Sequence, residues 1–306
     1  MNEPIKTEPS GKPAKKRALT DNILILFLLT FGLMFAGQLL GVLLILPLGL
    51  LPYSDVLVTL TDYLLFLGMW GLALLYLRFT KKNRPILGAV GRKAAGNNWK
   101  LLLFGFGVGF GLNALCVLVA WLHGDIVLTF VSFRPLPLLA VFAAIFVQSS
   151  AEELLCRGFL YQRLRRGYRS PLVAIIGNSL LFALLHLLND GVTVLSVLNI
   201  FTIGICFSLM VWYLDSLWCA MAVHTAWNFT QNILFGLPNS GMTVPFSVFR
   251  LDGAKGSFAY DVGFGLEGTF FADAVLIAAC VVLWLWGRKH GKKPLDVWAE
   301  PAQEAA

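Results

Sequence analysis

The chain has 306 residues, of which 58% are hydrophobic and only 13% carry a charge at neutral pH. Soluble domains have about 25% charged residues, so this composition, with a mean hydropathy of +0.74, excludes an ordinary soluble protein and indicates several transmembrane helices. The net charge of +7 does not indicate a nucleic-acid partner, because the basic residues lie in short clusters at the ends of apolar segments.

The chain begins with a polar, basic stretch, residues 1–20, which predicts a disordered cytoplasmic tail. The apolar run 23–49 is too long for a signal-peptide core and is not followed by a small-x-small cleavage site, so we expect an uncleaved first span. Seven further runs have about the twenty residues needed to cross about 30 Å of hydrocarbon. These runs are 56–77, 99–122, 137–162, 171–188, 192–213, 216–235 and 270–287.

These runs predict an all-α fold: a polytopic bundle of about eight transmembrane helices in a single domain, residues 21–290, followed by a short cytoplasmic tail, 291–306. Of the 24 Lys and Arg residues, 20 lie on alternate links of this arrangement: five in 1–20, seven in 78–100, four in 163–169 and four in 288–293. Because cytoplasmic loops are rich in lysine and arginine, both termini are expected in the cytoplasm. We expect a multi-pass protein of a bacterial cytoplasmic membrane.

Two further features have no chemistry assigned to them. The long outer loop, 236–268, is either a lid or an irregular surface connection, and the surface connection is favoured. The five cysteines lie in apolar stretches without a CxxC pair, which favours neither disulfides nor a zinc knuckle, so each is interpreted as a small buried hydrophobic residue. They are Cys116, Cys156, Cys206, Cys219 and Cys280.

Residues 148–159, QSSAEELLCRGF, place three ionisable groups inside an apolar segment, where each costs about 2.5–3.5 kcal/mol on insertion scales. Glu153 and Arg157 are four residues apart on a helix, so the arginine can neutralise that carboxylate. Glu152 is turned about 100° away and is left free for chemistry. The alternative is a structural ion pair beside a glutamate without a chemical role.

Two histidines, His186 and His224, lie in later spans. A lone intramembrane histidine is more often a hydrogen-bonding group between helices than a ligand, but two of them with an unpaired glutamate favour a site. Asn228 and Asn232 follow His224 at intervals of four residues, so the three share one helical face. Such a polar face requires partner helices or a polar cavity.

The depths of these groups are compatible with one site. At 1.5 Å per residue from the cytoplasmic helix ends, Glu152 lies about 16 Å deep, His186 about 22 Å and His224 about 12 Å, and helix tilt can close the gaps. A carboxylate near two imidazoles can take a proton from water, while amide and imidazole N–H groups stabilise the resulting oxyanion. Equally, one glutamate and two histidines form the ligand set of a catalytic zinc.

Three short motifs resemble those of a known family. EELLCRGFL (152–160) resembles the EExxxR motif of the CAAX protease and bacteriocin-processing family of intramembrane endopeptidases, also called the ABI family, which includes the type II CAAX prenyl endopeptidases. FALLH (182–186) resembles its FxxxH motif, and HTAWN (224–228) its HxxxN/D motif. The resemblance covers about residues 135–235 and implies a helical membrane-embedded protease.

The resemblance also implies roles for individual residues. Glu152 is expected to activate water, with Glu153 and Arg157 as its supporting pair, and the substrate carbonyl is expected near His186, His224 and Asn228. A mechanism that requires no cofactor is favoured, while zinc held by Glu152, His186 and His224 stays open. The expected partners are membrane lipids and a peptide or protein substrate, with lipidation and oligomeric state left open.

One position departs from the family pattern. Cys156 stands where an aromatic residue usually precedes the arginine. Helical geometry places it on the Glu152 face, where it would alter the pocket without replacing a catalytic group. A cysteine-protease mechanism is disfavoured, because an apolar membrane site does not stabilise a thiolate.

Two other classes of function remain as alternatives. A non-proteolytic scaffold or bacteriocin-immunity protein would keep the same fold. A proton- or metal-coupled transporter would use the same Glu and His groups, but it should show inverted repeats and paired broken helices, which the sequence lacks. The depth of the candidate site residues and the positions of the basic links suggest that substrate enters from the cytoplasmic side.

Overall fold

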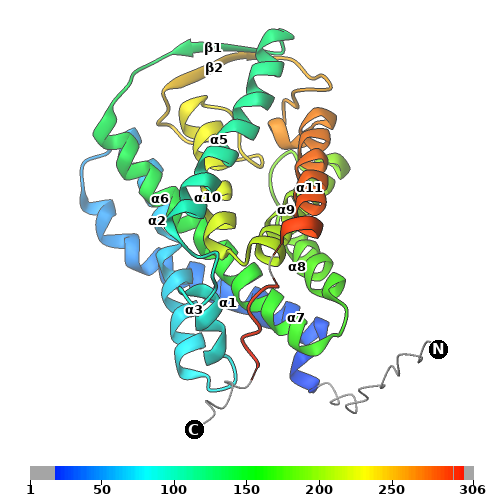
Figure 1. Ribbon diagram of the computed structural model, residues 1–306. Coiled ribbons are helices and arrows are strands. Elements are labelled where there is room, and N and C mark those ends of the chain that lie inside the picture. The colour runs from blue at the N-terminus through cyan, green and yellow to red at the C-terminus, as the bar shows by residue number, and fades with distance from the viewer. Residues whose placement is uncertain (1–17, 292, 300–306) are drawn as a thin grey trace, which may run out of the picture.

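Apolar runs joined by short polar links form the helices of the chain (Figure 1). The computed structural model describes residues 18–291 and 293–299. The all-α fold predicted for a membrane protein is confirmed, with one short β ribbon added at the top of Figure 1. The number of membrane crossings and the orientation of the termini stay predictions.

Six helical segments of the described chain are long and apolar enough to cross a membrane. The predicted fifth span is the 15-residue helix α8, and the predicted seventh span is α10 extended by a π-helical turn, η5. The eight predicted runs therefore all contain helix. The longer helices are α1 (Ile23–Ile45), α2 (Asp55–Leu64), α3 (Leu67–Phe79), α5 (Trp99–Leu122), α6 (Pro135–Glu153), α8 (Pro171–Leu185), α9 (Val194–Leu214), α10 (Leu217–Asn228) and α11 (Phe270–His290).

Short segments extend or connect these helices. They are η1 (Leu19–Asp21), η2 (Leu46–Leu50), η3 (Arg84–Ile86), α4 (Leu87–Val90), the π-helical turns η4 (Leu154–Leu160) and η5 (Phe229–Leu234), α7 (Tyr161–Gly167) and η6 (Leu266–Gly268). The links supply the helix caps: Asn98 accepts hydrogen bonds from the first backbone N–H groups of α5, and Ser216 from that of Cys219 in α10. Polar residues between apolar runs therefore set where helices begin.

Helix α10 lies at the centre of the bundle, against α5, α6 and α9. Its residues are buried except for Trp218, which is half-buried. Glycines make the approach to α5 close, because a Cβ on Gly109 would lie 2.3 Å from the carbonyl oxygen of Val223. Helices α1 and α3 meet in the same way: a Cβ on Gly37 would lie 2.5 Å from the Cα of Met69.

The outer loop, 236–268, has more structure than the sequence indicated. It contains strand β2 (Phe249–Ala254), which pairs antiparallel with β1 (Ile126–Phe130), the segment between α5 and α6. Asp125, just before β1, accepts hydrogen bonds from His123 Nδ1 at 2.8 Å and Ser257 Oγ at 2.5 Å. The ribbon thus ties the loop to the end of α5.

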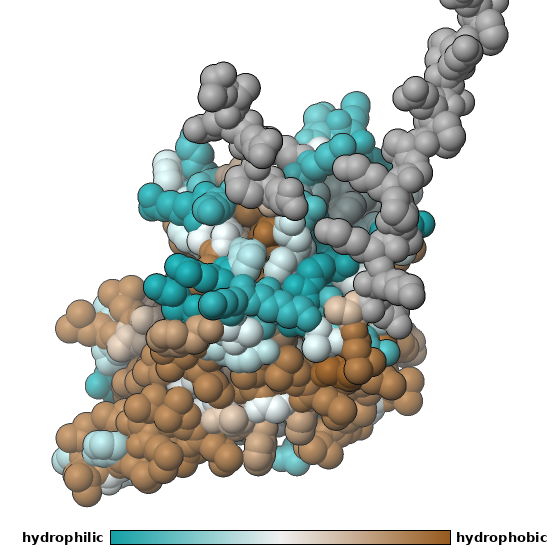
Figure 2. Space-filling model, turned by 90° about the horizontal axis from the view of Figure 1, so that it is seen from below, coloured by the Kyte–Doolittle hydropathy of each residue, from teal (hydrophilic) through white to brown (hydrophobic). Residues whose placement is uncertain are grey.

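The opposite end of the bundle carries the basic links, and Figure 2 shows hydrophilic residues gathered there beside apolar ones. Most of the predicted N-terminal tail, residues 1–17, lies outside the described residues. Its last part forms η1, where Asp21 pairs with Arg163 Nη2 at 2.7 Å and Arg166 Nη2 at 2.6 Å. Burial opposes ionisation of Asp21, but the hydrogen bonds and charges of the two arginines outweigh it and lower the pKa of this carboxyl group.

Candidate active site

The ion pair predicted between Glu153 and Arg157 is present at the end of α6. Arg157 Nη1 donates to Glu153 Oε1 at 2.9 Å, and Nη2 donates to the carbonyl oxygen of Gly204 at 3.1 Å. Both side chains are fully buried, and the guanidinium group lies over the rings of Phe182 and Phe207. A buried pair of this kind fixes the carboxylate in place, because separating the charges would leave one of them uncompensated.

Glu152, the neighbouring carboxylate, has a different environment. Its Oε1 accepts a hydrogen bond from Gln148 Nε2 at 2.7 Å. Its Oε2 lies 3.8 Å from His224 Nε2, which is too far for a hydrogen bond, and has no hydrogen-bond partner among the described residues. The side chain lines a cavity. One carboxylate oxygen is therefore held and the other is available.

His224 connects the two glutamates. Its Nδ1 lies 3.1 Å from Glu153 Oε1, and its ring stacks on Phe207 with centroids 5.2 Å apart. Since an ionised carboxylate only accepts hydrogen bonds, Nδ1 carries the proton. Nε2 then faces the free oxygen of Glu152. In the neutral ring Nε2 presents a lone pair to that oxygen, and in the imidazolium ion it presents an N–H group.

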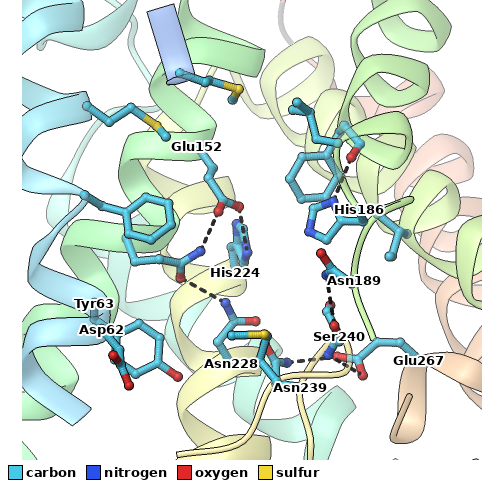
Figure 3. Close-up of a pocket in the computed structure, with 18 of the residues that line it drawn as sticks. Asp62, Tyr63, Glu152, His186, Asn189, His224, Asn228, Asn239, Ser240 and Glu267 are labelled. Atoms are coloured by element: carbon cyan, nitrogen blue, oxygen red, sulfur yellow. Dashed lines mark hydrogen bonds and ion pairs between the residues drawn. The ribbon is translucent and has the colours of Figure 1, made fainter. Parts of the chain in front are cut away.

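Asn228 lies one helical turn beyond His224, on the same side of α10. Its Nδ2 donates to Gln148 Oε1 at 3.2 Å, with a longer contact of 3.4 Å to Ser149 Oγ. Gln148 therefore contacts both Glu152 and Asn228, one with each end of its amide (Figure 3). This glutamine sets the position of a carboxylate and an amide together.

His186 lies at the end of α8, on the opposite side of the cavity from Glu152 (Figure 3). Its Nδ1 lies 2.8 Å from the carbonyl oxygen of Phe182, and since a carbonyl only accepts, Nδ1 is again the protonated nitrogen. His186 Nε2 is left without a hydrogen bond from the described residues. The structure thus places His186 at the cavity but on another wall than His224.

The cavity has a volume of about 570 Å³ and draws its walls from α1, α2, α3, α6, α8, α9, α10 and the outer loop. Four of the predicted site residues line it, while Glu153 and Arg157 are buried behind Glu152 and His224. The four are Glu152, His186, His224 and Asn228. Six residues predicted from separate motifs thus lie at or beside a single cavity, and all except His186 are joined by hydrogen bonds or ion pairs, in part through Gln148.

The π-helical turns change the expected faces of two residues. η4 begins directly after Glu153, and Cys156 is fully buried in the hydrophobic core rather than lining the cavity on the Glu152 face. η5 begins after Asn228, and Asn232 donates instead to the carbonyl oxygens of Leu237 and Met242. The extra residue in a π turn rotates the residues downstream of it, so spacing counted at 3.6 residues per turn places these two wrongly.

Another carboxylate at the cavity, Glu267 of η6, was not predicted from the sequence. It accepts hydrogen bonds from Trp227 Nε1 at 2.9 Å, Gln231 Nε2 at 2.6 Å and Asn239 Nδ2 at 2.9 Å. Burial raises the pKa of Glu267, although these hydrogen bonds act in the opposite direction. Glu267 fastens the outer loop to α10, which gives that loop a place in the cavity wall.

Gln148 was also missed as a site residue, although the sequence held a signal for it. It is a polar residue one helical turn before Glu152 within an apolar span. No comparable signal marked Glu267, because polar residues are ordinary in a loop.

The ligand set considered for zinc, Glu152, His186 and His224, does not form a metal site in the described residues. In residues 18–291 and 293–299, no three side chains from His, Cys, Asp and Glu are grouped closely enough to hold an ion. Glu152 approaches His224, but His186 lies across the cavity (Figure 3).

The cavity is also bordered by residues at the lipid-facing surface. Phe31 and Phe35 of α1 are 53% and 56% exposed, and Leu188, after α8, is 95% exposed. The outer loop contributes Asn239 to Val244, whereas the lining includes no residue of the basic links. The cavity is therefore bordered by exposed apolar side chains and by the outer loop, and cytoplasmic entry of the substrate stays a prediction.

Comparison with models of protein families gives a match to part of the chain. Residues 134–230 match the family model described as Type II CAAX prenyl endopeptidase Rce1-like. No individually curated protein matches the chain significantly. The matched segment runs from the start of α6 into η5 and holds all six predicted site residues. Over this segment the chain is similar to the type II CAAX prenyl endopeptidases, a family of membrane-embedded proteases, and the chain is an integral membrane protein.

Proposed function

We propose that the chain hydrolyses a peptide bond of a protein substrate with water activated by Glu152. The observation that carries this proposal is the free Oε2 of Glu152, beside His224 Nε2 in the cavity. The separation of 3.8 Å suits a water molecule that lies about 2.8 Å from each atom. Such a water is held next to a base and polarised by it.

In the proposed reaction the water oxygen bonds to the substrate carbonyl carbon while its proton passes to Glu152 Oε2. The carbonyl oxygen becomes an oxyanion, and Asn228, which lines the cavity, offers its Nδ2 amide group as a donor to it. Glu152 then returns the proton to the leaving nitrogen as the C–N bond breaks. The products are a carboxylic acid and an amine, and no covalent enzyme intermediate forms.

The remaining residues position this pair. Gln148 holds Oε1 of Glu152, so that Oε2 keeps its direction. The Arg157–Glu153 pair holds Nδ1 of His224, which fixes the tautomer and leaves Nε2 at the water. Through Gln148, Asn228 is kept on the same side as the water. His186 borders the space for the substrate from the opposite wall.

The test is cleavage of reporter peptides by the purified full chain in liposomes. Glu152→Gln keeps the shape of the side chain but removes the base, so we expect the rate to fall by about 10²–10⁴-fold. Asp252→Asn, on the exposed ribbon, is the matched control and should keep wild-type activity. Equal activity of Glu152→Gln and wild type would contradict the proposal and favour the scaffold alternative.

Each protein is also assayed with a zinc chelator. Under the proposed mechanism the chelator leaves the wild-type rate unchanged. Loss of activity with the chelator, restored by added zinc, would mean that a metal activates the water and that Glu152 has another role.

A further inference from the structure

Asp62 on α2 lines the same cavity as Glu152 and is not explained by the proposed chemistry. It lies seven residues into the helix, about 10 Å along its axis. Among residues 18–291 and 293–299 it has no hydrogen-bond or ion-pair partner. An unpaired carboxylate in a membrane-spanning helix costs free energy, and such residues generally mark a pathway or a binding site.

Acidic side chains outnumber basic ones in the cavity lining. The described lining contains three carboxylates but neither lysine nor arginine. Arg157 is the cation closest to the proposed chemistry, and it is buried behind the cavity and paired with Glu153. An acidic group of a substrate would be repelled by these carboxylates, whereas a basic group would be attracted. The three carboxylates belong to Asp62, Glu152 and Glu267.

These carboxylates are not equivalent. The carboxylate oxygens of Glu267 accept hydrogen bonds from Trp227, Gln231 and Asn239. Glu152 is the proposed base for the water molecule. Only Asp62 has both oxygens free for a ligand. It is therefore the group that can form a complete ion pair with a bound cation.

The position of Asp62 is fixed by its neighbour. Tyr63 donates from its hydroxyl group to Asn232 Oδ1 at 2.8 Å, which ties this part of α2 to η5. Figure 3 shows Asp62 and Tyr63 on one wall and His186 and Asn189 on the other. A peptide lying between these walls with a carbonyl at Glu152 passes Asp62 on one side.

We propose that Asp62 is the specificity residue of this cavity and binds a basic side chain, lysine or arginine, close to the scissile bond of the substrate. This inference rests on the proposed function, since the peptide must lie with a carbonyl at Glu152. It defines a substrate class with a cationic residue near the cleavage site and disfavours an acidic one.

The experiment compares three reporter peptides that differ at one position near the cleaved bond, which carries Lys, Gln or Glu. The kcat/KM ratio of the Lys to the Gln peptide is expected to be about ten or more for wild type. In Asp62→Asn this ratio should fall towards one, and in Asp62→Lys the Glu peptide should become preferred over the Lys peptide. Asp55→Asn, two turns earlier on the same helix and outside the cavity lining, should keep the wild-type ratio.

The position on the peptide is found by moving the variable residue from three residues before to three residues after the cleaved bond. A Lys-to-Gln ratio near one at all these positions in wild type would contradict the inference. A Lys preference that persists in Asp62→Asn would contradict it as well, because the cation would then be bound elsewhere.

Measurements of peptide binding test the role of Asp62 separately from the proposed function. In Glu152→Gln, the dissociation constants of labelled Lys and Glu peptides should still differ by about tenfold, and the additional Asp62→Asn change should remove the difference. Undiminished cleavage by Glu152→Gln, with the binding preference intact, would overturn the proposed mechanism but not the role of Asp62. Equal binding of both peptides, or binding of neither, would overturn the role of Asp62.

Discussion

At the scale of single residues, the site consists of groups that hold one another. Gln148 accepts from Ser149 and Asn228 at Oε1 and donates to Glu152 at Nε2. Oε1 of Glu153 accepts hydrogen bonds from both Arg157 and His224. Each proposed reacting group is thus oriented by one neighbour, which lowers the cost of reaching a productive geometry.

The Glu153–Arg157 pair leads to a stability prediction. In Glu153→Gln the guanidinium group of Arg157 stays buried without its counter-charge, so we expect a loss of about 3–5 kcal/mol in the free energy of unfolding. Denaturation in detergent micelles measures this loss. The double variant Glu153→Leu with Arg157→Met should regain much of the stability without regaining activity, because His224 Nδ1 still lacks its acceptor. A single variant as stable as wild type would contradict this account.

The predicted site residues could be found from the sequence because ionisable and amide groups inside apolar spans are costly and rare. Asp62 also lay in a predicted span but was overlooked, since it had no motif around it. The faces of Cys156 and Asn232 could not be predicted, because a π turn depends on how the helix packs. The roles of the six residues remain predictions that substitutions at these positions test.

At the scale of helices, close contact between α1 and α3 depends on glycine. Gly37→Val should strongly reduce the yield of folded protein and its thermal stability, because the new Cβ would meet the backbone of Met69. Gly32→Ala is the matched control on the same helix: nothing lies within 4 Å of its Cβ position, so it should be neutral or slightly stabilising. Equal stability of the two variants would show that α1 and α3 are not in close contact.

The anchor between η1 and α7 predicts a dependence on pH. The pKa of Asp21 is lowered below its ordinary value of 3.8, so its ionised form stabilises the fold above that value and the contribution is lost as the pH falls through the folded pKa. Wild type should therefore have a higher Tm than Asp21→Asn near pH 7. The difference should shrink below about pH 4. A Tm difference that is constant from pH 7 to about pH 3 would contradict this role.

The helices could be predicted from apolar runs of about twenty residues, whereas the β ribbon and the breaks within spans could not. The division between α2 and α3 at Leu65 and Phe66 lies inside one apolar run without Pro to mark it. The strands β1 and β2 are more than a hundred residues apart in sequence, so only tertiary contact shows their pairing. Patterns of hydrophobicity describe segments but not how they meet.

At the scale of the whole molecule, the distribution of basic residues predicts that the β ribbon faces away from the cytoplasm. Lys255→Cys at this end should react in intact cells with a maleimide that does not cross membranes. Lys81→Cys should react only after permeabilisation. The background should be low, because four native cysteines are buried and Cys280 is half-buried. The opposite labelling pattern would show that the orientation is inverted.

The exposed side chains that border the cavity, Phe31, Phe35 and Leu188, have a consequence for how the enzyme meets its substrate. A site with lipid at its border draws substrates that diffuse in two dimensions, so the relevant concentration is molecules per unit area of bilayer. Dilution with lipid at constant bulk concentration should slow such a reaction. We expect acyl chains to occupy this border when substrate is absent, so lipid should compete with the substrate and the lipid composition should change the apparent affinity.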